Sequence, residues 1–119
     1  MDGVSTVKME ITLVRTKDAE GMRYVGVRLD PESGTLIIEG QDLGPGVAAF
    51  FGASNTEYEY EVTVLVENIP RLLQTIGAAP GVWVLDALAA RFSGEEAHTL
   101  RTFLEKHGLA GPGWTRIGQ

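Results

Sequence analysis

The feature that most constrains the fold is a ten-residue stretch, residues 57–66, in which polar and apolar side chains alternate. Apolar or aromatic residues occupy every second position, namely Tyr58, Tyr60, Val62, Val64 and Val66. A period of two is typical of a β-strand with one buried and one solvated face. The stretch therefore predicts a strand that belongs to a half-covered sheet.

Three earlier segments, residues 7–13, 24–29 and 35–39, also predict strands. The connections between them are short, and Pro31 and Gly34 suit the tight turn that precedes the third segment. Short connections favour antiparallel pairing of consecutive strands, so the four strands should form a meander. The side chains expected on the covered face are Met9, Ile11, Val25, Val27, Leu36, Ile38, Tyr60, Val62 and Val64.

Helical spacing replaces the strand period after residue 66. Apolar residues recur three and four positions apart within residues 69–76, 83–92 and 93–107, which predicts about three helices. Ser93 and Glu96 have the spacing of a capping box for the last of them. Residues 40–55, rich in glycine, predict an irregular connection with a short helix, and residues 114–119 a short tail.

Strands followed by helices indicate an α+β fold: a four-stranded antiparallel sheet, a meander, with about three helices packed on one face. The 119 residues should form a single domain, residues 1–119, with a sheet half at 1–66 and a helical half at 67–119. One face of the sheet should remain in contact with solvent.

Composition excludes several classes of function. The chain has 16 Asp and Glu against 10 Lys and Arg and no cysteine. An acidic chain does not favour binding to nucleic acid or to an anionic membrane, and without cysteine there is neither a disulfide nor a thiolate metal site. With no signal-like or membrane-spanning segment in the sequence, we expect a cytoplasmic protein, monomeric or homodimeric, with no nucleic-acid or membrane partner.

The charge imbalance lies entirely in the sheet half, since residues 67–119 hold five acidic and five basic residues. Glu57, Glu59 and Glu61 point the same way from one strand, about 6.5 to 7 Å apart. This acidic ladder has two interpretations. It is either a docking surface for a basic partner or a solvated face whose charge is compensated by Lys8, Arg23 or Arg28.

The sequence offers no set of catalytic or metal-binding residues. His98 and His107 are the only histidines, and nine residues along a helix place them on opposite sides, so they cannot share a metal. His107 precedes Gly108 and suits a helix C-terminus. No serine lies in a nucleophile elbow, and the glycines of residues 40–46 lack a phosphate-loop motif. We therefore expect no catalytic residue, metal or cofactor.

Three aromatic residues are candidates for partner contacts together with the glutamate ladder. They are Phe50 and Phe51 in the connection and Trp114 in the tail, because aromatic side chains are favoured at binding hot spots. Tyr58 and Tyr60 are further candidates for the rim of a groove beside the connection.

Four strings, Glu39–Gly44, Phe50–Gly52, Glu57–Tyr60 and Asn68–Leu73, together with the closing segment Phe103–Gly108, resemble a group of small uncharacterised actinobacterial proteins. The resemblance covers roughly residues 22–115 and implies no functional residues. Small size, acidity and the absence of catalytic residues are similar to those of immunity proteins that neutralise bacterial toxins.

Two hypotheses follow from the sequence. The first is a non-enzymatic protein-binding module that docks a basic partner through an acidic sheet face, with an immunity protein against a toxin as one form. The alternative is a small-ligand-binding protein or enzyme with a pocket between residues 40–55 and the helices. A self-associating accessory domain is the third, less specific possibility.

Overall fold

The computed structural model describes residues 8–19, 21–52 and 56–118, with the side chains of Phe50 and Phe51 outside the description. Five antiparallel strands form one sheet in the order of the chain. They are β1 (Glu10–Asp18), β2 (Gly21–Leu29), β3 (Leu36–Leu43), β4 (Glu57–Val64) and β5 (Gly113–Gly118). The antiparallel α+β fold is confirmed, but the sheet has five strands rather than the predicted four.

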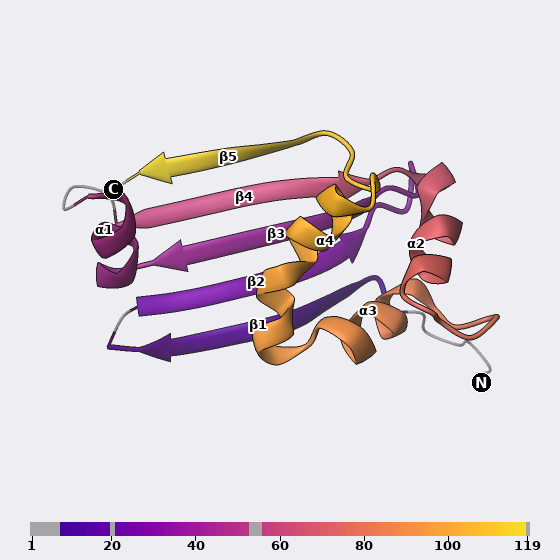
Figure 1. Ribbon diagram of the computed structural model, residues 1–119, viewed down its shortest axis with the longest axis horizontal. Helices are drawn as coiled ribbons and strands as arrows, with labels where there is room; N and C mark the ends of the chain where they lie inside the picture. Colours follow the sequence, from indigo (N-terminus) through magenta and orange to yellow (C-terminus); the bar gives the residue numbers. More distant parts are fainter. Residues whose placement is uncertain (1–7, 20, 53–55, 119) are drawn as a thin grey trace.

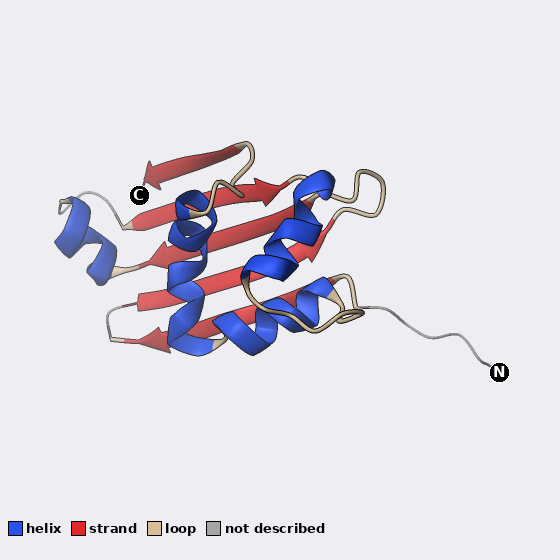
Figure 2. Ribbon diagram, turned by 45° about the vertical axis from the view of Figure 1, so that its right-hand side comes forward, coloured by secondary structure: helices blue, strands red, loops and turns tan. Residues whose placement is uncertain are grey.

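The helices cover one face of this sheet (Figures 1 and 2). They are α2 (Ile69–Thr75), α3 (Val84–Phe92) and α4 (Leu100–Lys106); the 3-10 segment η1 (Val66–Asn68) leads from β4 into α2, and η2 (Gly94–Thr99) joins α3 to α4. The short helix expected in the connection is α1 (Pro45–Phe51), at the end of the sheet where β3 leaves and β4 begins. Within the described residues there are thus four α-helices, one more than the three expected to pack on the sheet.

One hydrophobic cluster joins the two layers. Strand residues such as Leu36, Ile38 and Val64 are fully buried against helix residues such as Leu88 and Leu100. The predicted facing of β2, β3 and β4 is confirmed, because Val25, Val27, Leu36, Ile38, Val62 and Val64 are all buried. Burial of this kind contributes about 1.5 to 3 kcal/mol per large aliphatic side chain, which fixes the register of these strands.

The ends of the predicted strands differ from the structure. The register of β1 against β2 shifts by one residue between Thr12 and Val14, so both Leu13 and Val14 are buried. The strict alternation predicted for residues 7–13 therefore does not continue along β1. Met9 precedes β1 and is 37% exposed, although the alternation predicted it to be covered. Val66 begins η1 and is exposed, because β4 ends at Val64.

The strand β5 comes from residues that were predicted to be a tail. Gly111 donates its N–H to the Thr63 carbonyl at 2.6 Å, and Thr63 donates its N–H to the Pro112 carbonyl at 3.2 Å. These bonds return the chain to the edge of β4, so that β5 pairs along it from Val62 to Glu57.

The predicted capping box at Ser93 is wrong. Ser93 makes no side-chain cap to η2 and instead donates its hydroxyl hydrogen to the Ala89 carbonyl of α3. A serine hydroxyl that bonds back to the preceding turn is a common competitor of the cap.

Candidate functional site

The helices α2–α4 cover one face of the sheet (Figure 2), and the opposite face carries the predicted glutamate ladder, since the alternating residues Val62 and Val64 are buried under the helices. Register places Glu39 and Gln41 of β3 next to Glu61 and Glu59 of β4, and Trp114 and Arg116 of β5 on their other side. We call this surface the uncovered face. It presents five carboxylates, from Glu10, Glu39, Glu57, Glu59 and Glu61, and four cationic side chains, from Arg15, Lys17, Arg28 and Arg116.

The ladder is compensated mainly by an arginine that the sequence analysis did not consider. Arg116 Nη2 lies 3.1 Å from Glu57 Oε1 and 3.0 Å from Glu59 Oε1. Gln41 Nε2 donates to Glu59 Oε1 at 3.2 Å. Of the three predicted counter-charges, Arg28 pairs with Glu39 and Arg23 pairs with Asp42 on the other face.

Electrostatics distinguishes the two paired glutamates. Glu57, when protonated, donates a hydrogen bond to Glu59, and this bond together with their mutual repulsion raises the pKa of Glu57. The same bond, with those from Arg116 and Gln41, lowers the pKa of Glu59. Glu59 therefore keeps its charge more strongly than Glu57 as the pH falls.

Glu61 and Trp114 lie together near one edge of the uncovered face, where Glu61, like Glu10 on β1, forms no ion pair with the described residues. They are directly opposite each other on β4 and β5, which places their Cβ atoms about 5 Å apart. Among the side chains that the structure describes, none forms an ion pair or hydrogen bond with the Glu61 carboxylate. The Trp114 side chain belongs to a residue that is 48% exposed.

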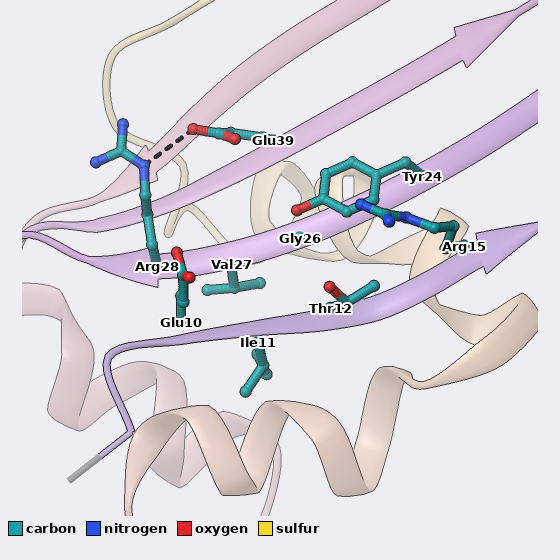
Figure 3. A pocket seen from close by; sticks show the side chains of 9 residues that line it. All are labelled: Glu10, Ile11, Thr12, Arg15, Tyr24, Gly26, Val27, Arg28 and Glu39. Carbon is teal, nitrogen blue, oxygen red and sulfur yellow. Dashed lines mark hydrogen bonds and ion pairs between the residues drawn. The ribbon is translucent and has the colours of Figure 1, made fainter. Parts of the chain in front are cut away.

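A hollow of about 300 Å³ lies on the same face over β1, β2 and β3 (Figure 3). Arg28 and Glu39, bonded at 3.0 Å, stand on one side with Glu10, and Tyr24 stands on the other with Arg15 stacked 5.2 Å from its ring centre. Gly26 forms the floor, where an added Cβ would lie 2.0 Å from the Tyr24 hydroxyl. The signal in the sequence was a glycine inside an otherwise regular strand, which often marks a close approach.

The predicted aromatic residues of the connection belong to a different element from the glutamate ladder. Phe50 and Phe51 lie in α1 at the end of the sheet, and their side chains are outside the described part of the chain. The structure therefore brings together Glu57, Glu59, Glu61 and Trp114, and leaves the contribution of the two phenylalanines as a prediction.

A second hollow, of about 280 Å³, lies on the helix-covered side, between the sheet and the η2–α4 segment. We call it the polar cleft. Tyr58 and Tyr60 line it together with His98 and Arg101, whereas the groove predicted for the two tyrosines lay beside the connection, residues 40–55. His107 occupies the C-cap position of α4 and does not line this cleft.

Comparison with family models, with curated proteins and with solved structures finds no match to this chain. In the part of the chain that is described, no three His, Asp or Glu side chains are grouped to hold a metal ion. The same residues include no helix of sufficient length and apolarity to cross a membrane. The function must be argued from the two sites themselves.

Proposed function

We propose that the protein is a non-enzymatic binding module that docks a basic protein partner on the uncovered face. The observation that carries this proposal is the half-exposed Trp114 directly across from the Glu61 carboxylate, with which no described side chain forms an ion pair. A lysine or arginine of the partner can pair with Glu61 while it lies against the indole ring. Tryptophan is enriched among the residues that dominate binding energies, and a cation over its ring contributes about 0.5 to 2 kcal/mol.

The pattern of charge supports specific docking rather than simple attraction to any cation. With five carboxylates and four cations, the uncovered face is nearly neutral, and most carboxylates already have a partner. A bound partner must therefore match the alternation of charges as well as their sign. Such complementarity contributes more to specificity and association rate than to affinity.

The hollow over Gly26 extends the proposed docking surface. Within it, Arg28 already pairs with Glu39 and Arg15 already covers the Tyr24 ring, so the carboxylate of Glu10 is the group that can pair with a basic side chain of the partner. The opposite pKa shifts of Glu57 and Glu59 resemble those of a catalytic acid–base pair, but neither carboxyl lines either hollow. A reaction of that kind needs one carboxyl in a desolvated pocket, so we favour binding over catalysis.

The particular form that we propose is an immunity protein against a basic toxin. The support is the small acidic chain, the solvated sheet face and the resemblance stated above. A toxin-like reading frame beside the gene would agree with this form, and the docking proposal does not depend on it.

In the test, the protein and its variants are immobilised, and the amount of partner that each captures from native lysate is compared. Trp114→Ala and Glu61→Gln should each lose the captured partner, because both remove the centre of the docking surface. A control variant, E32Q/E67Q/D86N, removes three exposed acids from the turns and helices and should keep it. Equal capture by all four proteins would contradict the proposal.

A further inference from the structure

The polar cleft gathers charged and polar side chains from five different elements. Arg23 comes from β2, Asp42 from β3, Tyr58 and Tyr60 from β4, and His98 and Arg101 from the η2–α4 segment. Residues so far apart in sequence meet here only because the helical layer crosses the sheet. The volume of about 280 Å³ suits a small molecule rather than a polypeptide segment.

Arg101 is held as a fixed planar cation in the wall of the cleft. Its Nη1 donates to the Tyr58 hydroxyl at 2.8 Å, and its Nη2 donates to Thr115 Oγ1 of β5 at 2.8 Å. Its guanidinium lies 4.7 Å from the centre of the Tyr60 ring, and its one carboxylate partner among the described residues, Glu105, is 3.8 Å away. A guanidinium positioned in this way loses little entropy when it binds a ligand.

His98, which lines the same cleft, has an unsatisfied ring nitrogen. Its Nε2 is buried and has no hydrogen-bond partner among the described residues. A buried polar atom without a partner costs about 1 to 3 kcal/mol, so its retention next to a cleft needs an explanation. A bound ligand that accepts or donates a hydrogen bond at Nε2 would remove this cost.

The two arginines that line the cleft, Arg23 and Arg101, are the groups that can hold an anion next to His98. Burial is the main cause that lowers the pKa of His98, and Arg23 lowers it further, whereas Glu95 and Asp42 raise it. Arg23 is held loosely, since its Nε is 3.4 Å from Asp42 Oδ1, which is long for an ion pair with a hydrogen bond. Arg101 and Glu105 are the other charged groups that line the cleft.

We propose that the polar cleft binds a small oxyanion, a carboxylate or a phosphate, that bridges Arg23 and the Nε2 of His98, with Arg101 as the second cation. Both classes present planar or tetrahedral oxygens that match the fork of a guanidinium. The anion replaces the loose contact between Arg23 and Asp42 and satisfies the buried imidazole nitrogen. This site is on the helix-covered side and does not depend on the proposed docking function.

Anion binding is coupled to protonation of His98. A negative charge beside the imidazole favours its protonated form, so the bound anion raises the pKa of His98. By linkage, the affinity for the anion should rise as the pH falls from 7 toward 5, by up to about tenfold per pH unit while one proton is taken up.

The experiment follows the two histidine ring signals by NMR while inorganic phosphate, or separately succinate, is added to the full-length protein. His107 is an internal control, because it lies outside the cleft. We expect saturable shifts and a raised pKa at His98 with at least one of the two probes, and no such change at His107. Response to phosphate alone or to succinate alone identifies the class of ligand within the proposal.

Two variants complete the test. Arg23→Gln should lower the affinity for the anion at least about tenfold. Arg91 is an exposed arginine of α3 outside the cleft, so Arg91→Gln should leave this affinity unchanged. Thermal unfolding of both variants checks that the fold is intact. No response of His98 to either probe, an equal response of His107, or an undiminished affinity in folded Arg23→Gln would overturn the proposal.

Discussion

The substitution Gly113→Ala tests the attachment of β5, the strand that carries Trp114. An added Cβ at Gly113 would lie 2.2 Å from the Glu61 carbonyl oxygen and 3.0 Å from the Val62 Cα. A carbon and an oxygen that are not bonded need about 3.3 Å, so β5 must move about 1 Å away from β4. No side-chain rotation relieves this contact, because both opposing atoms belong to the backbone.

The cost follows from the bonds that this movement breaks. Three hydrogen bonds tie the start of β5 to β4: Gly111 N–H to the Thr63 carbonyl, and the Thr63 N–H and hydroxyl to the Pro112 carbonyl. At about 1 kcal/mol net for each bond, the variant should lose about 2 to 3 kcal/mol of unfolding free energy. For a domain of this length, the thermal midpoint should fall by about 8 to 12 °C.

A matched control is available at the other end of the same strand. An added Cβ at Gly118 meets no atom within 4 Å, so Gly118→Ala should change the midpoint by less than about 2 °C. Thermal unfolding followed by circular dichroism measures both variants. A midpoint for Gly113→Ala within about 2 °C of the wild type would refute the proposed pairing of β5.

Three further predictions concern the core, the pH dependence and the hollow. Val62→Asp places an unpaired charge in the core and should prevent folding, which circular dichroism would show; an unchanged thermal midpoint would contradict the facing of β4. Because burial lowers the pKa of folded His98, the unfolded chain is protonated first, so unfolding free energy should fall as the pH drops below about 6.5, and less so in His98→Gln. Gly26→Ala displaces Tyr24 from the hollow and should lower the affinity for the captured partner several-fold, while the thermal midpoint changes by less than about 2 °C. An unaltered affinity would exclude the hollow from the docking surface.

The strands β2, β3 and β4 could be predicted because each has one strongly buried face. The strand β5 could not, since all but one of its six residues are exposed and burial imposes no alternation on them. In β1 the alternation fails at the shift between Thr12 and Val14, where two consecutive residues are buried. Local sequence carries the signal of a strand only where one face is covered.

The candidate site was predictable to a similar degree. The common face of Glu57, Glu59 and Glu61 follows from strand geometry alone. The pairing of Arg116 with Glu57 and Glu59 depends on β5, so it was missed together with that strand. The polar cleft depends on how η2 and α4 cross the sheet, and no spacing in the sequence brings Arg23 next to His98.

The most direct test of the docking proposal is the association rate of the captured partner as a function of ionic strength. The variant E57Q/E59Q/E61Q keeps side-chain size, removes three negative charges and leaves Arg116 without its partners. We predict that it associates about tenfold more slowly at low salt and with a weaker salt dependence, whereas E32Q/E67Q/D86N retains the rate of the wild type. A partner whose association is indifferent both to the three glutamines and to ionic strength would contradict the account and direct the search to α1, which carries Phe50 and Phe51.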